Sequence, residues 1–133
     1  MTSVAATLPD LTRRLLDAQT FAVLGTINPD GSPHSTVVWV KRDGDEILFS
    51  SLRGRRKTRN VERDPRVSLV VFDPANPYDY VGIQGAVSMT EEGGPDLINE
   101  LSMKYQGQPY TYDTPDMVRV VFRITPESVV GSG

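Results

Sequence analysis

Residues 21–41, FAVLGTINPDGSPHSTVVWVK, decide the fold of this sequence. Residues 21–27 form a short apolar run that suits a buried strand. Residues 28–31, Asn-Pro-Asp-Gly, are typical of a turn, because proline presets φ and glycine accepts the unusual backbone at the end of the turn. Residues 32–41 follow as a second strand, in which alternate side chains share a face. The stretch therefore predicts two consecutive antiparallel strands.

The same alternation of strands and turns continues along the chain. Asp43-Gly44 is a hairpin signal that leads into a strand at residues 46–51. Further strands are predicted at residues 67–72, 80–90 and 117–124, and helices at residues 8–19, 57–63 and 95–105. The expected fold is mainly β (α+β): a six-stranded antiparallel sheet closed as a small barrel, with flanking helices. No linker or repeat divides the chain, so residues 1–133 are expected to form a single domain.

Composition excludes several classes of protein. The chain has no cysteine and one histidine, which excludes disulfide frameworks, thiolate sites and multi-histidine metal sites. A net charge of −3 argues against a general nucleic-acid binder. No apolar run approaches the roughly 20 residues that span a bilayer, and no signal peptide is evident. We therefore expect a cytoplasmic protein with no metal, nucleic-acid or membrane partner.

Positive charge is concentrated in residues 53–66, which carry a net charge of +5 in this acidic chain. Such a segment indicates a small anionic ligand, since a polyanion would require a broader basic face. Arg55 and Lys57 are the better candidates, close to the hydroxyls of Ser50 and Ser51, because guanidinium, ammonium and helix-start N–H groups suit a phosphate. The alternative is a solvated basic loop. Arg59, Arg63 and Arg66 are expected to face solvent or pair with acids.

Two further features could line a site for a planar ligand. His34, Ser35, Thr36 and Val37 form an alternating strand segment, whose simpler interpretation is an edge strand with a surface histidine. Tyrosines at positions 78 and 80 could stack on a ring or cover a dimer interface, although plain packing is the commoner role. No G-x-G-x-x-G, P-loop or G-x-S-x-G motif is present. The sequence therefore indicates a binding site, and its catalytic residues stay unidentified.

Together these features resemble the split β-barrel flavin and deazaflavin oxidoreductases typified by pyridoxamine 5′-phosphate oxidase, the FMN-binding split barrel type. The resemblance covers about residues 8–125 and rests on three blocks of sequence. They are FAVLGT running into DGSPH, KTRNV with RDPRVS, and VGIQGAV. The second block is the most specific and looks most like the actinobacterial branch that uses coenzyme F420.

The resemblance implies a homodimer with cofactor sites at the subunit interface. It places Arg55, Lys57 and Thr58 on the cofactor phosphate, with the two serines of residues 50–51 nearby. It places residues 34–37 along the isoalloxazine-like ring, while Tyr78, Tyr80 and Gln84 would reach in from the partner subunit. The sequence lacks the C-terminal substrate segment of pyridoxamine 5′-phosphate oxidase, so vitamin B6 oxidation is not expected.

The resulting expectation is an F420-dependent oxidoreductase that transfers a hydride between the deazaflavin and a flat conjugated small molecule. Enones, quinones and tetrapyrrole-like molecules are the candidate substrates. An FMN-dependent reductase or oxidase of the same fold is one alternative, and a non-catalytic flavin or F420 carrier is another. Solvent, His34 or a tyrosine could supply the proton.

Overall fold

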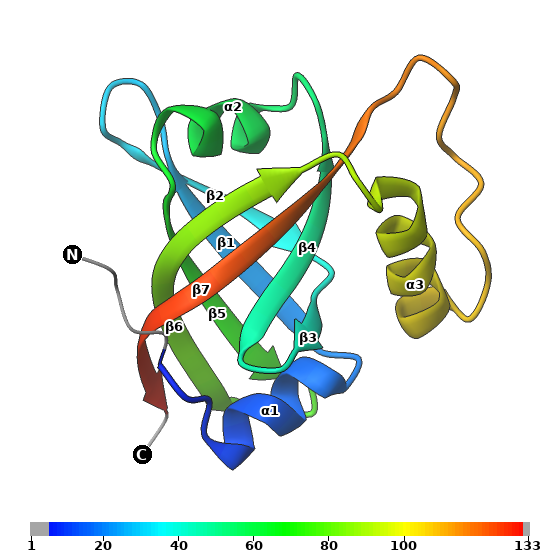
Figure 1. Ribbon diagram of the computed structural model, residues 1–133. Coiled ribbons are helices and arrows are strands. Elements are labelled where there is room, and N and C mark those ends of the chain that lie inside the picture. Colours follow the sequence, from blue (N-terminus) through cyan, green and yellow to red (C-terminus); the bar gives the residue numbers. More distant parts are fainter. Residues whose placement is uncertain (1–5, 132–133) are drawn as a thin grey trace.

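The computed structural model describes residues 6–131, which fold into one antiparallel sheet with three helices (Figure 1). The helices are α1 (Asp10–Asp17), α2 (Arg56–Arg63) and α3 (Gly94–Gln106). The strands are β1 (Phe21–Ile27), β2 (Pro33–Val38), β3 (Lys41–Asp43), β4 (Glu46–Leu52), β5 (Arg66–Asp73), β6 (Asn76–Thr90) and β7 (Arg119–Gly131). The predicted α+β barrel is therefore confirmed, with seven strands in place of the expected six.

The strand order is β2-β1-β5-β6-β7-β4-β3, so β2 and β3 are the edges of the sheet. These edges are joined directly through Trp39 and Val40, which curls the sheet into a barrel (Figure 1). The sequence predicted one strand here because apolar residues run on without a turn signal. Side chains of α3 hold the backbone of Val40: Tyr105 Oη accepts from its N–H at 3.2 Å, and Lys104 Nζ donates to its carbonyl at 2.7 Å. These bonds replace ladder partners and divide the strand.

Alternate residues of the strands fill the barrel. In β4, Ile47 and Phe49 point inward, and the ring of Phe49 stacks on Phe122 of β7 with ring centroids 4.5 Å apart. In β6, residues 81, 83, 85 and 87 are buried, as the predicted alternation requires. Burial of these side chains supplies the main drive for folding.

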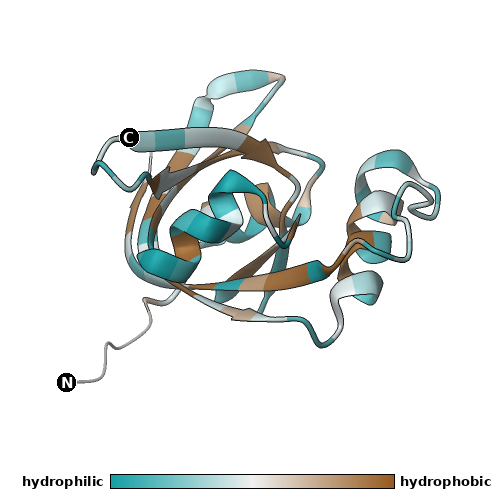
Figure 2. Ribbon diagram, turned by 90° about the horizontal axis from the view of Figure 1, so that it is seen from above, coloured by the Kyte–Doolittle hydropathy of each residue, from teal (hydrophilic) through white to brown (hydrophobic). Residues whose placement is uncertain are grey.

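The helices occupy three different places around the barrel. In Figure 1, α1 and α2 lie at opposite ends, and α3 lies outside the barrel. Seen from above, α2 is mostly hydrophilic and lies across the barrel end (Figure 2). A second apolar cluster attaches α3 to the outside of β4 and β7, through Leu97 and Leu101 against Leu48 and Val121. No helix within residues 6–131 is long and apolar enough to cross a membrane.

Strand β7 differs most from its predicted bounds. It begins at Arg119 and runs to Gly131, whereas the sequence predicted residues 117–124. The extension follows from β6, which pairs with β7 along its length and shifts register between Gln84 and Gly85. At that shift a Cβ on Gly85 would lie 2.3 Å from the carbonyl oxygen of Thr125, so the close strand approach requires glycine.

Lys104, near the C-terminal end of α3, connects this helix to α1 and to the link between β2 and β3. Its ammonium donates to the carbonyl of Leu16 at 2.5 Å as well as to Val40 at 2.7 Å. Burial lowers the pKa of Lys104 to about 8, while Asp17 opposes that shift. Because the folded pKa lies below the usual value of 10.5, the unfolded chain binds the proton more tightly between these two values.

We predict that Lys104→Met lowers the free energy of unfolding at pH 7 by about 1–3 kcal/mol, because two carbonyls lose their donor. The stability of the wild type relative to the variant should rise as the pH rises from about 8 to 10.5, the window in which only the unfolded state keeps the proton. Urea unfolding at a series of pH values measures both effects. A difference that stays constant with pH would contradict the assigned role.

Candidate functional site

The segment between β4 and α2 brings polar groups to one end of the barrel. Strand β4 ends at Leu52, the chain turns at Gly54 with φ of 89°, and α2 begins at Arg56. Arg55 is the N-cap residue, and its side chain makes no capping hydrogen bond to the first-turn N–H groups of α2. Free first-turn N–H groups favour an anion.

Ser51 and Thr58 are the least exposed of the predicted site residues, and their predicted role at a phosphate stays a prediction. Both are buried, and the hydroxyl of Thr58 donates to the carbonyl of Leu52 at 2.7 Å. The side chain of Thr58 therefore stabilises the turn into α2, while Ser51 points into the barrel on the inward face of β4. The sequence could not separate these roles, because a small hydroxyl residue suits both a phosphate site and a turn.

A cavity of about 200 Å³ lies beside the start of α2; we call it the α2 pocket. It is lined by residues of β2, β4, α2, α3 and the segment that follows α3. The lining residues are Val37, Val38, Trp39, Ser50, Lys57, Ile98, Leu101 and Tyr110. The pocket therefore brings together three predicted site residues, Val37, Ser50 and Lys57, from separate parts of the sequence.

Lys57 is the main charged group of the α2 pocket. Its Nζ lies 3.5 Å from Thr36 Oγ1, and within residues 6–131 no carboxylate forms an ion pair with it. Burial lowers the pKa of Lys57, and the positive charges of Arg55 and Arg119 lower it further. An ammonium that is half-buried among other cations would be stabilised by an anion in the pocket.

Arg119 is a residue that sequence reasoning missed. Its side chain is only 10% exposed, and its guanidinium pairs with Asp113 at 2.6 Å through Nε. Its other end, Nη1, lies 3.3 Å from Ser50 Oγ, and the group stands 4.9 Å from the ring centroid of Tyr110. The available signal was a lone arginine within the apolar run MVRVVF at residues 117–122. A charge in a buried strand requires partners.

The predicted ring-binding segment is the edge strand β2. His34 and Thr36 are half-buried on one face, whereas Ser35 and Val37 are exposed on the other. Thr36 hydrogen-bonds to Lys57 and Val37 lines the same pocket, so the strand brings two of its four predicted residues to the charged group. The alternative of an edge strand with a surface histidine agrees with the position of β2 in the sheet.

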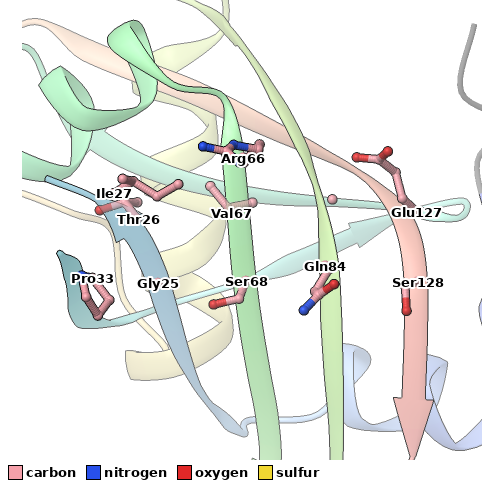
Figure 3. Close-up of a pocket in the computed structure, with 11 residues that line it drawn as sticks. Gly25, Thr26, Ile27, Pro33, Arg66, Val67, Ser68, Gln84, Glu127 and Ser128 are labelled. Carbon is pink, nitrogen blue, oxygen red and sulfur yellow. The ribbon is translucent and has the colours of Figure 1, made fainter. Parts of the chain in front are cut away.

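A second cavity, of about 390 Å³, lies against the outer face of the sheet (Figure 3). Its floor is a cross-strand row of small and polar residues, in which Gly25 pairs with Ser68, Ser68 with Gln84, and Gln84 with Ser128. Gln84 is the one predicted site residue in this cavity. The row places Gln84 outside the barrel, away from the lining of the α2 pocket.

Tyr78 and Tyr80 also lie outside the α2 pocket, as exposed residues near the start of β6. In one chain they therefore do not meet Lys57. Their predicted approach from a partner subunit stays a prediction.

Arg59, Arg63 and Arg66 were expected to face solvent or to pair with acids, and all three are exposed. Arg66 is exposed and pairs with Asp64 at 2.7 Å, as expected. Arg63 is exposed, as expected, and its guanidinium also donates to the carbonyl of Ile27 and to Asn60 Oδ1. It does so because α2 packs against the end of β1, where Asn60 also donates to Thr26 Oγ1 at 3.0 Å. The KTRN motif therefore fastens α2 to the barrel.

These groups are the donor set that a phosphate requires. Lys57 supplies an ammonium, Ser50 a hydroxyl, and α2 its first-turn N–H groups, while Arg55 adds positive charge beside them. The apolar wall of Trp39, Ile98 and Leu101 suits the carbon skeleton of the same ligand. The residues present therefore fit a cofactor that carries a phosphate.

Comparison with solved structures identifies similar folds. A structure titled F420 Reductase is 29% identical, with a TM-score of 0.82, covering 92% of this chain and 98% of that chain. The conserved hypothetical protein Rv2991 from Mycobacterium tuberculosis is 24% identical with a TM-score of 0.75, covering 99% of this chain and 89% of that one. HupZ from Group A Streptococcus is 13% identical with a TM-score of 0.70, covering 93% of each chain, and shares the fold alone.

The family relationship rests on the sequence itself. The profile of the family described as Pyridoxamine 5′-phosphate oxidase matches residues 8–132, nearly the whole chain. This match agrees with the antiparallel barrel and with the resemblance seen in the three sequence blocks. The chain belongs to the pyridoxamine 5′-phosphate oxidase family of split-barrel proteins.

Proposed function

We propose that this protein is an oxidoreductase that binds coenzyme F420 with its phosphate in the α2 pocket and acts on a flat conjugated small molecule. The observation that carries the proposal is Lys57, a half-buried ammonium with cationic neighbours and no carboxylate partner within residues 6–131. The similarity to a structure titled F420 Reductase supports the choice of cofactor. FMN is the second candidate, favoured by the family description.

The proposed roles of the residues follow from their positions. Lys57, Arg55 and the start of α2 hold the phosphate, and β2 lies along the ring system. Bound deazaflavin supplies hydride chemistry, so the protein has to provide position and electrostatics. Enones, quinones and tetrapyrrole-like molecules are the proposed substrates, because their flat conjugated systems can lie over the ring.

We further propose that a second copy of the chain covers the outer face of the sheet. Exposed and partly buried apolar residues form a row across it, in which Val37 pairs with Val23, Val23 with Val70, Val70 with Gly82, and Gly82 with Val130. Val37 and Val130, at the two ends of this row, are 63% and 67% exposed, and Val70 between them is 40% exposed, so the row presents apolar surface to a partner. The partner would then bring Tyr78, Tyr80 and Gln84 to the cofactor.

The cofactor assignment predicts tighter binding of F420 than of FMN. The F420 tail carries carboxylates beyond its phosphate, and these can meet the basic segment of residues 53–66. Titration by quenching of Trp39, which lines the α2 pocket, measures both affinities. Affinity should fall as salt rises, because partly exposed charge pairs are screened. Equal, salt-independent affinity for riboflavin and F420 would contradict the assignment.

Turnover separates an enzyme from a carrier. We expect reduced F420 to be oxidised in the presence of one or more quinones or enones at a rate that depends on protein concentration. Absorbance of the cofactor measures that rate. Tight binding without turnover across the panel would favour the carrier.

Lys57→Ala should weaken cofactor binding on the order of 10- to 100-fold, because a charge-assisted contact of roughly 1.5–3 kcal/mol is lost. Its melting temperature without cofactor should stay close to that of the wild type. Lys41→Ala is the control, since Lys41 is ion-paired with Glu100 on the surface outside the pocket. Reduced binding in the control, with normal binding by Lys57→Ala, would place the phosphate elsewhere.

Val70→Glu should convert the dimer to a monomer and weaken cofactor binding, because it puts a charge at the centre of the outer face. Met103→Glu is the control, as an exposed apolar residue on α3. Light scattering at micromolar protein measures the mass. A wild type that shows only the 14.7 kDa species would refute the dimer, and a monomeric variant with full affinity would refute the shared site.

A further inference from the structure

The contact between Arg119 and Ser50 fixes what the Ser50 hydroxyl can do. A serine hydroxyl has one proton to donate and two lone pairs to accept with. Nη1 of Arg119 lies 3.3 Å from Ser50 Oγ, and a guanidinium can only donate, so Ser50 is the acceptor. The proton of Ser50 must therefore point to a different partner.

That partner lies in the direction of the α2 pocket. Ser50 and Lys57 line the same cavity, and among residues 6–131 no protein acceptor takes the Ser50 proton. The same cavity already favours an anion, because Lys57 has no carboxylate partner among the residues that the structure describes. An anionic oxygen in the pocket would accept hydrogen bonds from both the Lys57 ammonium and the Ser50 hydroxyl.

We propose that Arg119 is a positioning residue, which orients Ser50 so that its hydroxyl donates to a phosphate oxygen of the bound cofactor beside Lys57. This inference rests on the proposed function and deepens it. Arg119 acts through Ser50, because its Nη1 donates to Ser50, its Nε and Nη2 donate to Asp113 at 2.6 and 2.9 Å, and Ser50 rather than Arg119 lines the α2 pocket.

The same arginine fixes one wall of the α2 pocket. Asp113 and Tyr110 belong to residues 107–118, a segment without helix or strand that extends beside α3 (Figure 1). Arg119 pairs with Asp113 and stands over the ring of Tyr110, and Tyr110 lines the pocket. Arg119 therefore contacts both Tyr110, in the wall of the α2 pocket, and Ser50, the proposed donor to the phosphate.

The test uses pairs of ligands that differ in the phosphate. FMN is compared with riboflavin, and F420 with its phosphate-free deazaflavin core, by titration of Trp39 fluorescence. The ratio of the two affinities within a pair reports the phosphate contact alone. A residue that only supports the wall would weaken both members equally and leave the ratio unchanged.

Ser50→Ala should lower that ratio by about 10-fold, since one hydrogen bond to a charged group is lost. Arg119→Met should lower it by a comparable factor. The double variant should be no worse in the ratio than either single variant, because both changes remove the same contact. Arg119→Lys keeps a cationic donor on this side of Ser50 and should lower the ratio less than Arg119→Met does.

Arg123→Met is the matched control, an arginine of the same strand that pairs with Asp43 and Glu46 away from the pocket. It should leave the ratio at the wild-type value. An unchanged ratio in Arg119→Met, or fully additive losses in the double variant, would overturn the inference while leaving the proposed function in place. If the wild type binds neither phosphate-bearing ligand, the proposed function fails and the inference fails with it.

Discussion

Lys104 and Tyr105 hold the backbone of Val40, and both the barrel and the candidate site depend on this contact. Without a break at Val40, β2 would continue straight on, as its apolar sequence predicts. With the break, β2 and β3 become the two edges of one sheet and the sheet closes. The same contact draws α3 against the barrel, where Trp39 stacks on Tyr105 at 5.4 Å. Trp39 and Leu101 of α3 both line the α2 pocket, and the closure of the barrel therefore determines where these two residues lie.

The candidate site is positively charged because of which basic residues form ion pairs and which do not. Most arginines outside α2 have a carboxylate partner, including Arg13 with Asp45, Arg42 with Asp17, and Arg123 with Asp43. Such surface pairs add little stability, but they neutralise the charges that they join. Within the described part of the chain, Arg55 and Lys57 have no such partner. An acidic protein with unpaired cations at one helix start carries a local positive potential there, which would favour a phosphate over a neutral group.

Sequence reasoning succeeded where a local signal determines a local structure. The turn at residues 28–31, the alternation in β6 and the glycine break before α2 carry their structure in their own residues. It failed where a residue takes its role from a partner that its own pattern does not reveal. The break at Val40 depends on the distant residues Lys104 and Tyr105, while Thr58 bonds to Leu52 and Arg119 pairs with Asp113, each six positions away. The α2 pocket could be predicted from the basic segment, but its far wall comes from residues more than forty positions away.

Strand β2 connects the two proposed properties of the protein. Its inward face brings Thr36 to Lys57, and its outward face presents Val37 to the surface where a second copy is proposed. Because the side chains of a strand alternate, any shift of β2 that accommodates one neighbour moves the residues that face the other. Cofactor binding and association of two chains would then share one structural element. Each would stabilise the other by linkage, since a ligand that binds only the associated form shifts the equilibrium toward it.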